Sequence, residues 1–309
     1  MDLSNLENKD HLKIIITDSG LGGLSVHALL DKRLSEKNKN AELIFFNSLA
    51  HSNFGYNSML EKSDKLNVFN SALEGMLKFN PDLILIACNT LSVLYHETKI
   101  SKEIKIPVIG IVENGIDLIL ENLINHQDAN ILILGTETTI NSDQHKKDLI
   151  KSGIEENIIY SQSCKNLESE IQNDANSPAV EKLINFYLSE AFNKIKNKNV
   201  HQLVLLACTH YGYSKNIFEK QLFEFCGNNF TILNPNEKMS EMLNGNSLHP
   251  MKKCIIKNRV LSRVEISNEQ ISNLAKLLEK DSITVSHALK NYEYKSDLFE
   301  FDKKNIRVK

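Results

Sequence analysis

Two cysteines follow short apolar runs in matching contexts. Residues 85–90 are Leu-Ile-Ala-Cys-Asn-Thr, and residues 205–210 are Leu-Leu-Ala-Cys-Thr-His. A thiolate is a strong nucleophile and can also act as a base. Two thiols on opposite sides of one carbon could remove a proton from one face and return a proton to the other. Cys88 and Cys208 therefore predict proton transfer at a carbon atom.

Polar side chains next to these cysteines could assist such a reaction. Asp18 could hold or shuttle a proton beside Cys88, and His210 could do so beside Cys208. Neutral donors could bind a carboxylate and stabilise the charge that grows on it as the adjacent carbon loses its proton. Each residue alone has a structural alternative, such as a helix cap or a buried apolar thiol. The candidate neutral donors are Ser19, Asn89, Thr90 and Thr209.

The elements that would position these residues are alternating strands and helices. The expected strands are continuously apolar, as strands covered on both faces should be. Segments 60–77, 142–151 and 180–195 have the spacing of amphipathic helices. This alternation predicts a parallel sheet with helices on both faces. The expected strands are residues 13–17, 42–46, 82–87, 108–112, 130–134, 157–160, 202–207 and 230–233.

A coarse repeat divides the chain. Cys88 follows Asp18 by 70 residues, and Cys208 follows Thr138 by the same interval. Both halves run from a strand through a polar loop and further α/β units to a strand and an Ala-Cys loop. Ligands of open α/β sheets bind beyond the carboxyl ends of strands, where all four loops would lie. Two similar domains facing each other would line one cleft with these loops, although coincidence alone could also produce the spacing.

The composition excludes several classes of protein. The chain has 309 residues, which is enough for two domains, and it is 41% hydrophobic and 24% charged, as globular proteins are. A net charge of −3 and the lack of a basic cluster argue against nucleic-acid binding. Apolar runs of six or seven residues are too short to span a membrane, and the first dozen residues do not form a secretory signal. Five irregularly spaced cysteines argue against a disulfide framework, so we expect a cytoplasmic protein.

Two other kinds of site are disfavoured. The segment Gly20-Leu-Gly-Gly-Leu-Ser25 is similar to a dinucleotide-binding loop, but it has serine at the sixth position and no acidic residue after the second strand. Cys208 and His210 lack a second pair of ligands with metal-binding spacing, so no metal site is expected. Cys164, Cys226 and Cys254 have no such motif context and are interpreted as structural.

Four segments in order resemble the cofactor-independent aspartate/glutamate racemase family, and most of all its glutamate racemases. The resemblance covers roughly residues 13–245, and the four segments together are much more specific than any one alone. It implies a racemase without a cofactor, in which Cys88 deprotonates the D-enantiomer and Cys208 the L-enantiomer. The segments are Asp18-Ser-Gly-Leu-Gly-Gly-Leu-Ser25, Ala87-Cys-Asn-Thr90, Gly135-Thr-Glu-Thr-Thr-Ile140 and Ala207-Cys-Thr-His-Tyr211.

The resemblance also implies an architecture and partners. We expect two pseudo-symmetric flavodoxin-like α/β domains with mostly parallel sheets and the active site between them. Residues 1–112 with 231–309 would form the first domain, including a C-terminal extension, and residues 113–230 the second. The partner would be glutamate or aspartate, with D-glutamate supplied for peptidoglycan synthesis, and the family's frequent dimers allow a homodimer here. Further substrate contacts would come from Phe54, Gly55, Thr138 and Thr139.

Departures from the family pattern, among them Gly212 where a proline is usual, leave the substrate side chain open. The family's Pro-Tyr-Gly loop is replaced by Asn53-Phe54-Gly55, which removes a phenol hydroxyl and a rigid proline. The family often has a glutamate near the second thiol, where this chain has Gln172. Aspartate racemisation, broader amino-acid specificity, and a catalytically silent amino-acid-binding or regulatory protein are therefore the alternatives. A one-thiol decarboxylase of the same superfamily is disfavoured because both cysteines are present.

Overall fold

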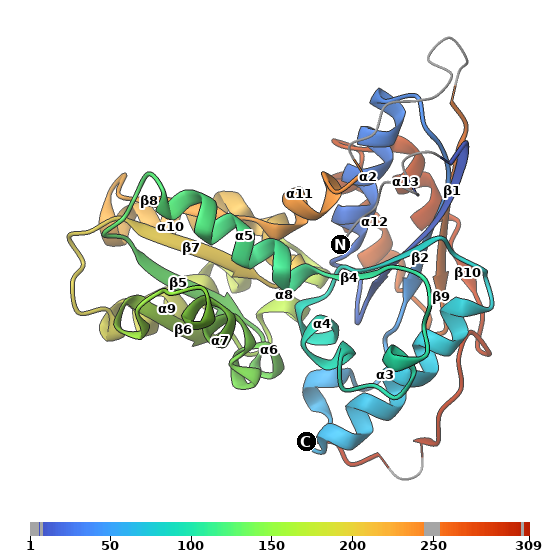
Figure 1. Ribbon diagram of the computed structural model, residues 1–309, viewed down its shortest axis with the longest axis horizontal. Helices are drawn as coiled ribbons and strands as arrows, with labels where there is room; N and C mark the ends of the chain where they lie inside the picture. Colours follow the sequence, from blue (N-terminus) through green and yellow to red (C-terminus); the bar gives the residue numbers. More distant parts are fainter. Residues whose placement is uncertain (1–5, 7–8, 244–253, 304–305) are drawn as a thin grey trace.

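Two parallel β-sheets form the framework of the protein in this computed structural model, which describes residues 6, 9–243, 254–303 and 306–309 (Figure 1). The first sheet has the strand order β10-β9-β2-β1-β3-β4, and the second has the order β6-β5-β7-β8. All neighbouring strands pair in parallel. The strands are β1 (His11–Asp18), β2 (Asn40–Asn47), β3 (Leu83–Ile86), β4 (Val108–Gly110), β5 (Asn130–Gly135), β6 (Ile159–Ser163), β7 (Gln202–Ala207), β8 (Phe230–Leu233), β9 (Ile256–Ser262) and β10 (Glu293–Tyr294).

The expected strands are present, most of them with ends that differ by one or two residues, and in two the difference involves a helix or turn. The strand expected at 108–112 ends at Gly110, because Ile111 already begins a helix. The strand expected at 157–160 begins only at Ile159, after a single 3₁₀ turn, and continues to Ser163. The periodicity of a short apolar run does not distinguish a strand from a helix, and this explains both errors.

Helices cover both faces of each sheet (Figure 1). The expected helices at 60–77 and 180–195 correspond to α3 and α9. The helix expected at 142–151 begins only at Gln144, as α7, because Asp143, with φ of 59°, separates it from α6, which ends at Ser142. None of the helices in the described part of the chain is long and apolar enough to cross a membrane. The helices are α2 (Leu24–Glu36), α3 (Lys62–Leu77), α4 (Asn89–Tyr95), α5 (Ile111–Leu123), α6 (Glu137–Ser142), α7 (Gln144–Lys151), α8 (Leu167–Asn173), α9 (Pro178–Lys194), α10 (Lys215–Cys226), α11 (Pro235–Ser240), α12 (Asn268–Leu278) and α13 (Ile283–Lys290).

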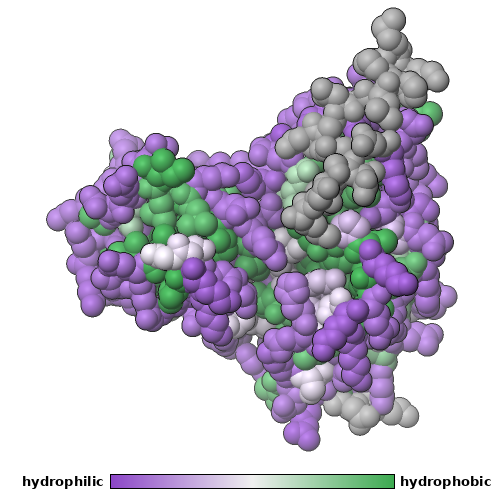
Figure 2. Space-filling view, viewed as in Figure 1, coloured by the Kyte–Doolittle hydropathy of each residue, from purple (hydrophilic) through white to green (hydrophobic). Residues whose placement is uncertain are grey.

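Burial on both faces accounts for the continuously apolar strands. Ile14 and Ile16 of β1 pack on the face covered by α2, α12 and α13, while Ile15 packs on the opposite face with α3 and α4. The second sheet is enclosed in the same way, with α8, α9 and α10 on one face and α5 and α7 on the other. Most of the surface in Figure 2 is hydrophilic, with apolar side chains gathered over α5. Each sheet therefore has a core on either side, as doubly wound α/β folds do.

The two sheets share one topology. The order β2-β1-β3-β4 in the first sheet repeats as β6-β5-β7-β8 in the second, which is the flavodoxin-like order. The expected fold class is therefore confirmed. The domain boundary expected between residues 230 and 231 falls inside β8, which pairs with β7. Residues 231–233 thus belong to the second sheet, and the rest of the expected domain division stays a prediction.

The C-terminal residues extend the first sheet. β9 pairs with β2 from Ala41↔Ile256 to Asn47↔Ser262, and α12 and α13 pack against α2. A buried polar network holds β9 in place. His27 Nε2 lies 2.7 Å from Asn258 Oδ1, and Asn258 Nδ2 donates to Asp31 Oδ1 at 2.7 Å. In its described part, the C-terminal extension therefore lengthens the first sheet.

We predict that His27 makes the fold sensitive to acid. Burial lowers the pKa of His27 to about 4 from an ordinary value of 6.5. The folded protein thus contains His27 with a neutral imidazole. This contribution to the free energy of unfolding is fully present above pH 6.5. It is lost as the pH falls towards 4, which lowers the free energy of unfolding by up to about 3 kcal/mol. Chemical denaturation across this range should show a smaller loss of unfolding free energy in His27→Gln than in the parent protein. The exposed His96→Gln is the control, and equal losses in parent and His27→Gln would contradict the prediction.

Candidate active site

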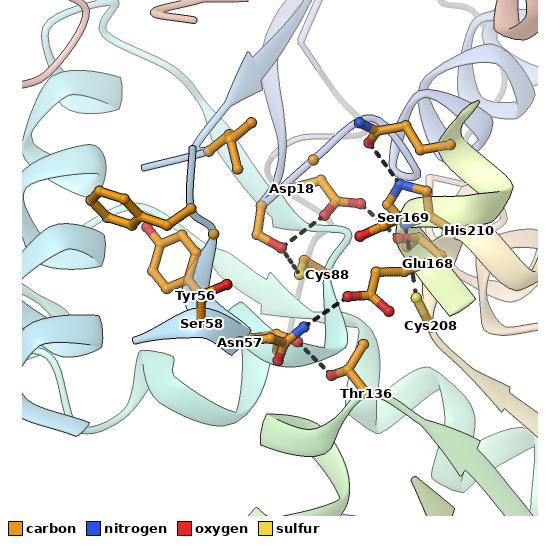
Figure 3. Close-up of a pocket in the computed structure, with 18 of the residues that line it drawn as sticks. Asp18, Tyr56, Asn57, Ser58, Cys88, Thr136, Glu168, Ser169, Cys208 and His210 are labelled. Carbon is orange, nitrogen blue, oxygen red and sulfur yellow. Dashed lines mark hydrogen bonds between the residues drawn. The ribbon is translucent and has the colours of Figure 1, made fainter. Parts of the chain in front are cut away.

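A cavity of about 310 Å³ lies at the carboxyl ends of the strands of both sheets. Cys88 follows β3 in the first sheet and Cys208 follows β7 in the second, so the two cysteines occupy equivalent positions in the repeated topology. Both line the cavity, with exposed fractions of 5% and 7% (Figure 3). The structure therefore brings the two thiols from equivalent loops to one small site.

A short chain of polar groups leads away from Cys88. Its Sγ lies 3.2 Å from Ser19 Oγ, and Ser19 Oγ lies 3.5 Å from Asp18 Oδ1. Ser19 was expected to bind substrate, but its hydroxyl also stands between the thiol and the carboxylate. Asp18 can therefore exchange a proton with Cys88 through Ser19.

The second thiol lies beside an imidazole whose tautomer is set by its neighbours. Gln172 Oε1 accepts from the backbone N–H of Leu21 at 2.9 Å, which fixes the orientation of the amide. The same oxygen lies 3.0 Å from His210 Nε2, so Nε2 carries the hydrogen. His210 Nδ1 is then an acceptor, 3.8 Å from Cys208 Sγ. Gln172 thus carries no proton itself but orients His210 to take one from Cys208.

The loops of the two sheets are joined at the site. Asp18 Oδ2 accepts from Thr209 Oγ1 at 2.6 Å and from the backbone N–H of Gly23 at 2.6 Å. A Cβ at Gly22 would lie 2.5 Å from Thr209 Oγ1 and 2.8 Å from the backbone nitrogen of His210. Glycine is therefore required at position 22 for the loop after β1 to approach the loop after β7.

Neutral donors line the cavity between the thiols. Both polar atoms of the Asn89 side chain are buried without a hydrogen-bond partner, which leaves them available to a ligand. Thr90 Oγ1 lies 2.9 Å from Thr136 Oγ1, so hydroxyls of the two sheets meet at the cavity wall. Thr136 also caps α6, because its Oγ1 accepts from the backbone N–H of Thr139. Asn89, Thr90 and Thr209 thus lie where the sequence predicted donors.

Two expected substrate contacts do not reach the cavity wall. Thr138 Oγ1 accepts from Lys65 Nζ at 2.9 Å and lines a neighbouring cavity instead. Thr139 is buried, with its Oγ1 3.1 Å from that of Thr136. The turn of helix that follows Thr136 directs both side chains away from the thiols. Thr136 is the residue of this segment that faces the site, and the sequence analysis did not single it out.

The loop between β2 and α3 forms another wall. Phe54 and Gly55 line the cavity as expected, and the Phe54 ring stacks on His51 with centroids 5.1 Å apart. Tyr56 is buried beside them, and its hydroxyl has no hydrogen-bond partner. The phenol that the sequence lacks at position 54 therefore has a counterpart two residues later, which only the folded loop shows.

Sequence reasoning also missed Glu168 and Asn57. Glu168 lies on α8 one turn before Gln172, so spacing of four residues on one helix face was the signal that could have found it. Its Oε1 accepts from Asn57 Nδ2 at 3.3 Å, and both residues line the cavity (Figure 3). Asn57 comes from the first sheet's loops and Glu168 from the second, so this bond also crosses the site.

Burial keeps the two thiols and the imidazole uncharged. It raises the pKa of the Cys88 thiol, and the Asp18 carboxylate adds to this effect. Burial likewise raises the pKa of Cys208, with a further contribution from Glu168. The pKa of His210 is lowered by burial, so its imidazole is neutral at pH 7. The cysteines are therefore thiols, and each needs a neighbouring base before it can abstract a proton.

Known proteins resemble most of this chain. The family model described as Asp/Glu/Hydantoin racemase matches residues 39–235. A glutamate racemase of Leptospira interrogans is 30% identical over 244 residues, covering 77% of this chain and 88% of that protein. A glutamate racemase of Leptospira borgpetersenii is 28% identical over 259 residues, covering 84% and 88%.

Solved structures support the fold. The glutamate racemase of Francisella tularensis in complex with D-glutamate has a TM-score of 0.66 at 24% identity, over 88% of this chain and 95% of that chain. The glutamate racemase of Aquifex pyrophilus has a TM-score of 0.60 at 23% identity, over 88% and 96%. The family model matches more than half of the chain, and a relative is 30% identical over 77% of it, so this chain belongs to the Asp/Glu/hydantoin racemase family.

Proposed function

We propose that the chain is a glutamate racemase in which Cys88 and Cys208 act as the two acid–base groups. The observation that carries this proposal is the equivalence of the two thiols, since each follows the third strand of a repeated 2-1-3-4 sheet and both line one cavity. A racemase must act on both faces of the α-carbon, and this arrangement supplies one thiol for each face.

The proton pathway of each thiol uses different neighbours. On one side, Asp18 takes the proton of Cys88 through Ser19, and the thiolate removes the α-proton of the D-enantiomer. On the other side, His210 takes the proton of Cys208 through Nδ1, and the thiolate removes the α-proton of the L-enantiomer. The thiol that remains protonated delivers its proton to the opposite face. Both pathways rest on contacts of 3.2 to 3.8 Å.

The substrate's α-carboxylate would be bound by neutral donors. The unpartnered amide of Asn89 and the hydroxyls of Thr90 and Thr136 line the cavity together with the thiols, whereas Thr209 donates its hydroxyl hydrogen to Asp18. Hydrogen bonds to the carboxylate strengthen as the α-carbon loses its proton and negative charge moves onto the carboxylate oxygens. This provides stabilisation that is larger in the transition state than in the bound substrate.

The choice of glutamate rests on the relatives, several of which are named glutamate racemase. On this proposal, the product D-glutamate would serve peptidoglycan synthesis. A protein that binds amino acids without turning them over is the alternative, and the altered Phe54 loop and Gln172 are the features that would favour it. The cytoplasmic location and the homodimer expected from the sequence stay predictions.

We predict that each active-site cysteine is indispensable. Cys88→Ser and Cys208→Ser should each lower kcat for racemisation by on the order of 10³-fold or more, because one face of the carbon then lacks an acid–base group. Circular dichroism of L- and D-glutamate solutions measures the rate in each direction. Cys226→Ser, a half-buried cysteine of α10, is the matched control and should keep full activity.

Two results of that experiment would count against the proposal. Two-way turnover at near-parental rates in either active-site variant would exclude the two-thiol mechanism. A parental protein that binds glutamate in calorimetry without racemising it would favour the binding-only alternative.

We also predict that the hydrogen bond between Thr209 and Asp18 supports turnover. Thr209→Val removes the hydroxyl that donates to the buried carboxylate and should lower kcat/KM by about 10- to 100-fold, or roughly 1.4 to 2.8 kcal/mol. Thr209→Ser keeps the hydroxyl and should retain most of the activity. Equal losses in both variants, measured by the same circular dichroism assay, would show that keeping the hydroxyl does not preserve turnover, and would contradict the role of this hydrogen bond.

A further inference from the structure

The Glu168 side chain reaches into the cavity beside the two thiols. Figure 3 shows its carboxyl group between the sulfurs of Cys88 and Cys208 in that view, next to Asn57. Its Oε1 accepts from Asn57 Nδ2, while its Oε2 is buried and has no hydrogen-bond partner. The proton pathways of the two thiols use Asp18 and His210, so Glu168 has no part in them.

The described residues that line the cavity include no cationic side chain that could neutralise Glu168 as a second carboxylate beside Asp18. Asp18 and Glu168 are the acidic residues among the described residues of the wall, which include no lysine or arginine. The two histidines there, His51 and His210, have pKa values lowered by burial and are neutral at pH 7. Glutamate brings two carboxylates and one ammonium group, so an ionised Glu168 would repel it without compensation.

The two acidic side chains differ in their hydrogen bonds. Asp18 Oδ2 accepts two hydrogen bonds of 2.6 Å, from the Thr209 hydroxyl and from the backbone N–H of Gly23. Glu168 Oε2 accepts none. A buried carboxylate oxygen without donors is costly when ionised, whereas a protonated oxygen becomes a donor aimed into the cavity.

The surroundings of Glu168 favour its protonated form. Burial raises the pKa of Glu168 and outweighs the hydrogen bonds from its own backbone and from Asn57, which lower it; Glu137 on α6 raises it further. Glu168 also borders a second cavity, which is lined by Lys165 and Lys309. In the described part of the chain neither lysine forms an ion pair with Glu168, and Lys309 pairs with Glu137 instead. The titratable groups that face Glu168 from neighbouring elements are Glu137, Cys164, Lys165, Tyr187, Cys208, Tyr211 and Lys309.

We propose that Glu168 determines specificity for an acidic amino acid by staying protonated and donating from Oε2 to a carboxylate of the substrate. The inference rests on the proposed racemisation of glutamate, since it names a group that selects that substrate. No proton is transferred to the carbon by Glu168. Its deprotonation replaces a donor by a negative charge and expels the dicarboxylate.

The affinity for glutamate must then depend on pH with a defined sign. Below the pKa of Glu168 the donor is present and the dissociation constant is lowest. Above that pKa the dissociation constant rises by about tenfold per pH unit, because the binding form becomes scarcer in that proportion. An ionised Glu168 that bound the substrate's ammonium group would give the opposite sign.

The experiment is isothermal titration calorimetry of L- and D-glutamate across about pH 5 to 9, a range that begins just above the ordinary pKa of a glutamate carboxyl. It is carried out on the parental protein and again in a Cys88→Ser, Cys208→Ser background, where neither turnover nor thiol titration contributes. Glu168→Gln keeps a neutral donor and should hold the low dissociation constant over the whole range. Glu168→Ala lacks the donor and should raise the constant about tenfold or more at every pH.

Glu170→Gln is the matched control, because Glu170 lies on the same helix but not in the cavity wall. It should reproduce the parental pH profile. Parental affinity that is constant or increases with pH would overturn the proposal, as would a Glu168→Gln variant that keeps the parental profile or binds as weakly as Glu168→Ala.

The outcomes also separate this proposal from the proposed function. A parental protein that shows the expected binding profile but does not racemise glutamate would refute the racemase and leave the role of Glu168 standing. Racemisation of glutamate with a dissociation constant that does not depend on pH would support the racemase and refute the role of Glu168. A protein that binds only neutral or cationic amino acids, and not glutamate, would overturn the role of Glu168.

Discussion

A 2.6 Å hydrogen bond from Thr209 Oγ1 to Asp18 Oδ2 joins the loop after β1 to the loop after β7, and the active-site geometry depends on it. The bond connects residues 191 positions apart and links the neighbours of the two thiols directly. It forms only because Gly22 lets the two loops approach without a Cβ between them. Asp18 thereby has two tasks, since it accepts this bond through Oδ2 and faces Ser19 and Cys88 through Oδ1.

Burial gives the site its chemical character. The two thiols, the imidazole and the neutral donors all lie in a small space with little exposure to water, so ionisation of either thiol is unfavourable without a partner. Each thiol has a different partner, a carboxylate through a hydroxyl on one side and an imidazole on the other. The two faces of the site are thus equivalent in topology but not in chemistry, and the two reaction directions need not share one pH dependence.

Much of this arrangement could be predicted from the sequence, and the failures have physical causes. The buried strands and the four loops after them are local patterns of apolar runs and polar residues, so Asp18, Cys88, Cys208 and His210 could be placed together. β9 was missed because it lies near the sheet edge and carries Lys257, Asn258 and Arg259, which interrupt its apolar pattern.

The remaining differences depend on tertiary contacts that no local pattern contains. Thr138 and Thr139 sit in the matching segment, yet the first turn of α6 directs them away and leaves Thr136 at the wall. Glu168 and Asn57 meet across the two sheets, which spacing within either segment cannot show. In the sequence, Gln172 stands where the family often has a glutamate, and it was interpreted as the loss of a proton carrier. Its hydrogen bonds to Leu21 and His210 give it a positioning role instead.

The most direct test of the central claim is deuterium incorporation at the α-carbon, followed by NMR during early turnover of D-glutamate in D₂O. Two thiols on opposite faces predict that the L-glutamate formed carries deuterium from the outset, while the remaining D-glutamate keeps its proton. The reason is that the group that removes the proton is not the group that delivers one. L-glutamate that retains the original proton would show that a single group serves both faces, and would contradict the account.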